Sequence, residues 1–226
     1  MGSSSGRGSF LNKALSFDGA SRPRIACAVV LDAAILAKAM GDPAQRRATY
    51  DDLRAVPDHL VAEILNGVLV TQPRPASLHA RAASRLGIEI GGPFDRGKGG
   101  PGGWVILDEL ELHLHGDVVV PDLAGWRRAR MPEIPDATAF ELAPDWVCEV
   151  LSPSTSAIDR AEKMPIYARE RVGHAWLVDP IARTLEAYVL DEAARWVQLG
   201  AWRDESRVRA APFAEVELEL GALWAK

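Results

Sequence analysis

One carboxylate stands inside an apolar segment of the chain. Glu149 lies within residues 146–151, a run of mostly apolar residues that is too short for a helix and is bounded by Pro144 and Pro153. We therefore predict a buried strand there. Because an unpaired buried charge is costly, Glu149 needs a counter-ion, a proton or a metal ion. The plainest alternative to a metal site is an ion pair with a buried Arg or Lys.

A second carboxylate occurs in the same setting. Residues 118–120 predict another buried strand, and Asp122 follows at its end. Two strands that each deliver one acid predict a site for a hard divalent cation such as Mg²⁺, which prefers oxygen ligands. Downstream, Asp159, Lys163 and Tyr167 are spaced by four, which on a helix places them along one face. A lysine can therefore lean over a site made of two carboxylates.

The order of a Pro-Asp pair, a Glu on the next strand and a nearby Lys resembles the PD-(D/E)XK nuclease superfamily. Within it, the chain is similar to the Uma-two-type family of restriction endonucleases. The matching residues are Pro121-Asp122, Glu149 to Thr155, Asp159, Lys163, Tyr167, Gly173 and Trp176 to Pro180, with Glu63 to Gly67 and the Pro-rich segment up to His79 upstream. The resemblance covers about residues 48–222.

The resemblance implies an α/β fold with a restriction-endonuclease-like core, in which helices flank a mixed central β-sheet. It implies Asp122, Glu149 and Glu63 as catalytic and metal-binding residues for Mg²⁺ or Mn²⁺. For Glu63, an exposed strand position is the alternative. Leu151 stands where the superfamily pattern has its lysine, so the resemblance makes Lys163, on the following helix, the catalytic lysine.

Further site candidates accompany these four. They are His79, Ser152, Asp159 and Tyr167. His79 has a structural role as its simpler explanation, and Tyr167 either orients Lys163 or packs. Exposed arginines near His79, among them Arg74, either bind phosphate or are solvated.

The composition describes an ordinary soluble protein of 226 residues, with 48% hydrophobic and 25% charged residues. Its net charge of −5 argues against strong non-specific binding of nucleic acid but leaves room for a nuclease, whose metal-binding acids add negative charge. The two cysteines form no disulfide framework, which fits a reducing, cytoplasmic compartment. Cys148 is most simply a small core residue.

We divide the chain into residues 1–47, a flexible or helical N-terminal extension, and residues 48–226, the nuclease-like domain. Residues 2–9 are rich in Gly and Ser. Residues 26–40 superficially resemble a signal peptide, but Asp32 interrupts the apolar run, which is also too short to span a bilayer. We expect Met40 to be the native start.

The patterns predict the elements that position the site. Asn66-Gly67 indicates a hairpin between residues 62–65 and 68–71. We expect one helix that begins after a Thr49 cap and a second that is capped by Ser77 and runs to about residue 90. A third helix is expected over residues 159–172, with Pro165 in its first turn and Gly173 at its end. Strands are expected over residues 104–107, 110–115, 174–178, 183–190, 195–199 and 213–220.

Three surface segments have competing explanations. The Gly-rich residues 91–103 lack the helix that a phosphate-binding loop requires, so we expect a flexible loop or a mobile flap. His113 and His115 alternate with leucines, and a solvated sheet face explains them better than zinc. Arg127, Arg128 and Arg130 form the densest basic cluster, which is either a phosphate contact beside Asp122 or a solvated turn.

The leading hypothesis is therefore a metal-dependent endonuclease that hydrolyses phosphodiester bonds in DNA. We expect DNA as the substrate, no membrane association, and a homodimer as one possible assembly. The alternative is a catalytically silent nucleic-acid-binding or regulatory module on the same fold, since a fold does not imply a function.

Overall fold

The computed structural model describes residues 46–225. The predictions for residues 1–45, including a native start at Met40, lie outside this range, and the domain boundary stays a prediction. The helical segments are α2 (Tyr50–Arg54), α3 (Ser77–Ile90), η1 (Gly91–Asp95), α4 (Ser156–Ile158), η2 (Asp159–Lys163), α5 (Met164–Arg169) and α6 (Gly221–Trp224). None of the helices in this part of the chain has the length and apolar character that crossing a membrane requires.

A six-stranded sheet forms the centre of the fold, in the order β11-β10-β9-β8-β6-β3. Its strands are β3 (Trp104–Asp108), β6 (Leu123–Arg127), β8 (Trp146–Val150), β9 (His174–Asp179), β10 (Thr184–Leu190) and β11 (Trp196–Arg203). Strands β8 and β9 are parallel and the other neighbours are antiparallel, so the sheet is mixed. The expected α/β class with a mixed, helix-flanked sheet is confirmed.

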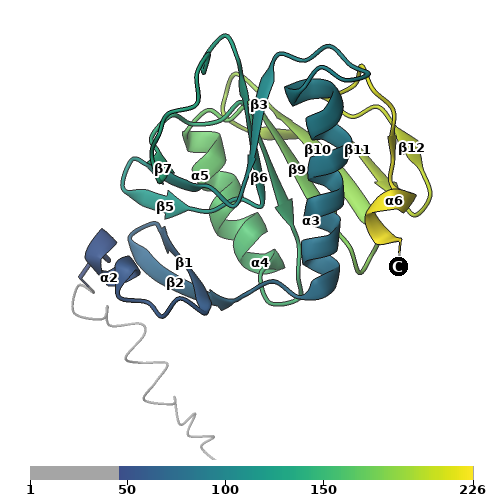
Figure 1. Ribbon diagram of the computed structural model, residues 1–226. Helices are drawn as coiled ribbons and strands as arrows, with labels where there is room; N and C mark the ends of the chain where they lie inside the picture. The colour runs from purple at the N-terminus through teal and green to yellow at the C-terminus, as the bar shows by residue number, and fades with distance from the viewer. Residues whose placement is uncertain (1–45, 226) are drawn as a thin grey trace, which may run out of the picture. The chain divides into compact units, whose positions relative to one another are not determined.

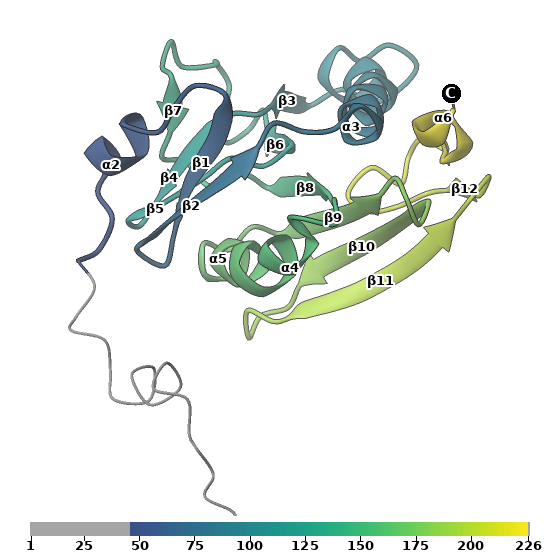
Figure 2. The ribbon, with the colours of Figure 1, turned by 90° about the horizontal axis from the view of Figure 1, so that it is seen from below.

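A five-stranded sheet packs beside it, in the order β2-β1-β5-β4-β7. Its strands are β1 (Leu60–Leu65), β2 (Val68–Pro73), β4 (Glu111–Leu114), β5 (Asp117–Val119) and β7 (Ala139–Phe140). Two short strands, β12 (Arg207–Val208) and β13 (Leu218–Glu219), pair near the C-terminus. Figure 2 shows the two sheets side by side, with the hairpin β1–β2 next to α4 and α5.

The alternation of side chains along β8 explains the two layers. Trp146 and Cys148 point into a core that α3 and the C-terminal segment close, and Val147 points into a second core closed by α5 and the five-stranded sheet. Figure 1 shows α3 and α5 as the two long helical segments beside the strands. Glu149 alternates to the α5 side, where β8 meets α5 and the smaller sheet.

Several local predictions are confirmed. Strands β1 and β2 form the expected hairpin, in which Asn66 and Gly67 both have positive φ, as a type I′ turn requires. Thr49 caps α2 in a reciprocal capping box with Asp52. Strand β4 buries Leu112 and Leu114 and turns its polar side chains away, as the alternation indicated.

The helix around Lys163 differs from the prediction. It starts at Ser156, three residues before the predicted start at residue 159. The segment η2 is a π-helical turn that ends at Lys163, two residues before Pro165. The proline is thus well inside one helical segment, where the wider turn precedes the residue that cannot donate an N–H. Arg171, not Gly173, adopts the left-handed conformation after this helix. Ala76 rather than Ser77 occupies the cap position of α3.

The C-terminal strand prediction over residues 213–220 is wrong except at β13. Instead of alternating along a sheet, Phe213 packs among the rings of Phe94, Trp104, Trp146 and Trp176, with centroid distances of 4.7–5.5 Å. Its apolar character therefore serves an aromatic core between α3 and the large sheet. Periodicity in the sequence could not distinguish the two arrangements.

Phe213 provides a test of this aromatic core. Phe213→Ala should lower the free energy of unfolding by about 3–5 kcal/mol, because a ring would be replaced by a cavity. Urea denaturation measures it. Leu199→Ala, in which the exposed side chain lies on β11, is the matched control and should change stability by no more than about 0.5 kcal/mol. Equal stability of the two variants would mean that Phe213 is not part of the core.

Candidate active site

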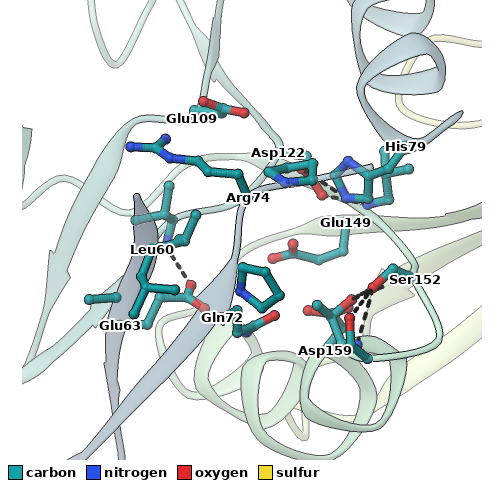
Figure 3. Close-up of a pocket in the computed structure, with 18 of the residues that line it drawn as sticks. Leu60, Glu63, Gln72, Arg74, His79, Glu109, Asp122, Glu149, Ser152 and Asp159 are labelled. Atoms are coloured by element: carbon teal, nitrogen blue, oxygen red, sulfur yellow. Dashed lines mark hydrogen bonds and ion pairs between the residues drawn. The ribbon is translucent and has the colours of Figure 1, made fainter. Parts of the chain in front are cut away.

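Asp122 and Glu149 reach the same cavity from neighbouring strands. Strands β6 and β8 pair with Leu123 opposite Cys148, so the next position of this register sets Asp122 opposite Glu149. Directly opposed residues of an antiparallel pair share one face. The Asp122 carboxylate accepts a hydrogen bond of 2.7 Å from the Val150 N–H. Both carboxylates line one cavity (Figure 3), so the structure brings the two predicted acids together.

The Lys163 ammonium lies among three buried carboxylates. Its nitrogen is 3.0 Å from Glu63, 3.3 Å from Glu149 and 3.5 Å from Asp159. The lysine is only 5% exposed, so it faces the site and not solvent, as predicted. Glu63 and Asp159, rather than Asp122, complete its contacts. The alternative explanation of Glu149, a buried ion pair with a lysine, therefore also holds.

Glu63 belongs to the site and is not the exposed strand residue of the alternative interpretation. It projects from β1, is 1% exposed, and one carboxylate oxygen accepts a hydrogen bond of 2.8 Å from the Val120 N–H. The other oxygen is buried and has no hydrogen-bond partner among the described residues. A buried acceptor without a partner is costly, which indicates that something binds there.

Tyr167 orients Glu149 rather than Lys163. Its hydroxyl donates a hydrogen bond of 2.5 Å to the carboxylate of Glu149 from the next turn of the helix. Asp159, one turn before Lys163, contributes a further carboxylate to the cavity. The four-residue spacing in the sequence therefore does place all three side chains on one face toward Glu149.

His79 and Ser152 line the cavity in different ways. The His79 ring is 3.3 Å from the Asp122 carboxylate. Burial alone would lower the pKa of His79, but the hydrogen bond and charge of Asp122 outweigh burial and raise it. Ser152 bonds instead to the hydroxyls of Ser154 and Thr155. His79 is thus a neighbour of the acids, whereas Ser152 forms part of the wall.

The electrostatics of the cluster favour added positive charge. Burial raises the pKa of the Glu149 carboxyl, Lys163 opposes this shift, and the neighbouring carboxylates add to it. Burial also raises the pKa of Asp159. Burial by itself would lower the pKa of Lys163, but Glu149, Glu63 and Asp159 together raise it well above its ordinary value. Every shift among these side chains favours the form that carries an extra proton.

The acids have the chemistry of a divalent-cation site, although they are not arranged as one. Within residues 46–225, no three His, Cys, Asp or Glu side chains are grouped in a geometry that could hold a metal ion. Glu63, Glu149 and Asp159 instead converge on the Lys163 ammonium. Carboxylate oxygens suit Mg²⁺ and Mn²⁺, and the unpartnered oxygen of Glu63 is available. The residues present therefore fit a cation that Asp122, Glu149 and Glu63 would share.

The cavity has a volume of about 720 Å³ and three kinds of wall. The acids and Lys163 form its floor. One side is apolar and comprises Leu53, Val56, Pro57 and Leu60 from α2, β1 and their connection. Arg54 and Arg74 also line it and are exposed, so each can meet a ligand from solvent.

The basic cluster of the sequence lies elsewhere. Arg127 ends β6, whereas Asp122 precedes its start, so the strand of five residues separates them by about 16 Å at 3.3 Å per residue. Arg128 pairs with Asp95, Arg130 with Asp145, and Arg127 stacks on Trp104. Of the two alternatives for these arginines, the described geometry favours the exposed turn over a phosphate contact beside Asp122.

Sequence reasoning missed part of the cavity. The apolar wall and Arg54 were not recognised. The sequence of α2 indicates a helix but does not indicate that its side chains line a cavity. Glu111, assigned to a solvated face, lines the cavity rim and accepts hydrogen bonds from Tyr50 and His113. Tertiary packing, which the sequence pattern does not reveal, places the rim residues around the acids.

Comparisons with known proteins identify the family and the fold. A sequence model of the Uma2 family, described as "Putative restriction endonuclease", matches residues 47–222. The fold is similar to a solved structure described as a putative nuclease belonging to DUF820 from Anabaena variabilis ATCC 29413, with a TM-score of 0.64 and 22% identity. That match covers 78% of this chain and 97% of the other. The comparison with curated proteins gives no match.

Lys163 should hold the acids together when no metal is bound. Lys163→Met keeps a long unbranched side chain but removes the ammonium charge, which leaves Glu63, Glu149 and Asp159 without their counter-ion. The free energy of unfolding in EDTA should therefore fall by about 3–5 kcal/mol. Lys98→Met, in an exposed loop, is the control and should be near neutral. If both variants unfold at the same urea concentration, Lys163 is not the counter-ion of the cluster.

Proposed function

The chain belongs to the Uma2 family, described as putative restriction endonucleases, and from this membership and the buried carboxylate cluster we propose that it is a metal-dependent nuclease that hydrolyses phosphodiester bonds in DNA. Asp122, Glu149, Lys163 and Glu63 are the proposed catalytic residues. The observation that carries the proposal is the convergence of four carboxylates and one lysine on one open cavity.

The excess of acid over base supports the metal dependence. Three carboxylates pair with the single ammonium of Lys163, Asp122 lines the same cavity, and the second oxygen of Glu63 has no partner in the described chain. Asp122, Glu149 and Glu63 would hold Mg²⁺ or Mn²⁺. When bound, such a cation polarises the scissile phosphate and lowers the pKa of its water.

The other side chains have roles that follow from their contacts. Lys163 is close enough to the acids to donate to a phosphate oxygen bound beside them and to stabilise charge that develops there. Tyr167 fixes one oxygen of Glu149, and the other oxygen accepts a hydrogen bond of 3.3 Å from Lys163. His79 holds Asp122 from the opposite side, and the Val150 N–H restricts the same carboxylate.

The competing proposal is a catalytically silent binding module. It is supported by the same Lys163 contacts, because an ion-paired cluster also stabilises a fold without any chemistry. A silent module gives Glu63 no reason to bury an oxygen without a partner. That observation favours the nuclease.

Metal titration separates the two proposals. Mn²⁺ should raise the melting temperature of the wild type, because a ligand that binds only the folded state stabilises it. Asp122→Asn and Glu63→Gln should each remove most of this shift, since each replaces a ligand oxygen by an amide of the same size. Glu141→Gln, at an exposed position outside the cavity, is the control. Equal shifts in all four proteins would exclude metal binding at this site.

Cleavage tests the role of the lysine. With Mn²⁺ present and folding confirmed by circular dichroism, Lys163→Ala should cleave DNA about 10²-fold more slowly than the wild type, the scale of losing one transition-state donor. Lys163→Arg should restore little activity, because a planar fork replaces a compact charge. The substrates would be plasmid, linear, branched and single-stranded DNA, and wild-type rates for Lys163→Ala on every form that the wild type cleaves would exclude the lysine from catalysis.

A further inference from the structure

We propose that the cavity receives one unstacked nucleotide of a DNA strand, so that single-stranded DNA and not intact duplex is the substrate. This inference rests on the proposed function and names its substrate class. Its basis is the depth of the acids, the size and walls of the cavity, and the positions of its arginines.

The depth of the acids is the first observation. Glu63 is 1% exposed, Glu149 is 2% exposed and Lys163 is 5% exposed. A phosphate must therefore descend below the protein surface to reach them. Duplex DNA is stiff over a length much greater than this site, so bringing its backbone into a local cavity costs deformation free energy. A single strand has no such restriction.

The size and walls of the cavity fit one extruded nucleotide. A volume of about 720 Å³ falls in the range of pockets that enclose a small molecule, about 300–1,000 Å³. Leu53, Val56, Pro57 and Leu60 also line the cavity and offer apolar surface to a base and sugar. Enzymes that act on an unstacked nucleotide bind its base in such a pocket. In this placement, the phosphate of one nucleotide lies at the acids and its base lies against the apolar wall.

Arg74 is the cation best placed to meet the incoming strand. It stands between Pro73 and Pro75, which restrict its backbone, and Figure 3 shows its side chain extending over the cavity. Within the described chain, its side chain donates one hydrogen bond, of 2.9 Å, to the Asp58 carbonyl oxygen and forms no ion pair. Its guanidinium therefore keeps donors for a phosphate, which it can bind through two parallel hydrogen bonds.

The densest basic cluster of the described residues is not free to bind a duplex. Binding a duplex requires several lysines or arginines that neutralise phosphates along both strands. Here the densest basic cluster, residues 127–130, is engaged with Asp95, Asp145 and Trp104. The chain as a whole carries a net charge of −5. At the cavity, Arg54 and Arg74 are exposed and can meet one strand.

Binding measured apart from cleavage tests the inference. A short fluorescein-labelled oligonucleotide, single-stranded or annealed into a blunt duplex, would be titrated with the full chain in Ca²⁺ and followed by fluorescence anisotropy. The single strand should bind at least about 10-fold more tightly than the duplex, since the duplex must first unstack a base. Arg74→Ala should weaken binding of the single strand about 10-fold. Arg195→Ala, which removes an exposed arginine on a distant hairpin, is the matched control.

The outcomes are distinct. Equal or tighter binding of the duplex, or no binding of either form, would overturn the inference. Arg74→Ala with wild-type affinity would overturn the placement of the strand in this cavity. If the single strand binds as expected but Mn²⁺ produces no cleavage, the occupancy of the cavity stands and the proposed nuclease activity fails.

Discussion

The cost of burying negative charge governs this structure. Glu63, Glu149 and Asp159 are almost fully enclosed, and each would be unstable there without a positive partner. Lys163 provides that partner, and it requires the helix from Ser156 to Arg169 to dock against β8 and the hairpin β1–β2. The positions of these elements therefore depend on one ammonium group. Its charge matches only part of the acid around it, and the proposed cation site rests on this excess of acid.

Much of the site could be predicted because its residues contradict their surroundings. Glu149 is polar in an apolar strand, and Asp122 follows directly after another, so physical chemistry demanded a partner before any coordinates were known. The spacing of Asp159, Lys163 and Tyr167 also indicates where their side chains point, because residues four apart lie on the same face of a helix. The Asn66-Gly67 turn fixes the register of the hairpin that carries Glu63. These are local signals, and the structure agrees with them.

The errors occur where long-range packing decides. The three arginines are adjacent in sequence to Asp122 but lie at the other end of β6, because a strand separates its ends by its own length. Phe213 sits in an alternating segment, yet three tryptophans and Phe94 surround it. The apolar wall of the cavity arises because α2 and the start of β1 meet the segment before α3. The sequence patterns of these segments do not indicate that they contact one another.

The π-helical turn η2 makes the site sensitive to the length of the chain. Each residue of an α-helix rotates the next side chain by about 100°, and η2 accommodates one more residue per turn than a regular helix does. Deleting a single residue between Asp159 and Lys163 could restore a regular helix while turning the lysine away from Glu149. Substitutions on this segment should therefore be tolerated far better than insertions or deletions. Among natural variants, a constant number of residues from Ser152 to Tyr167 would mark the chains that keep the lysine in its place.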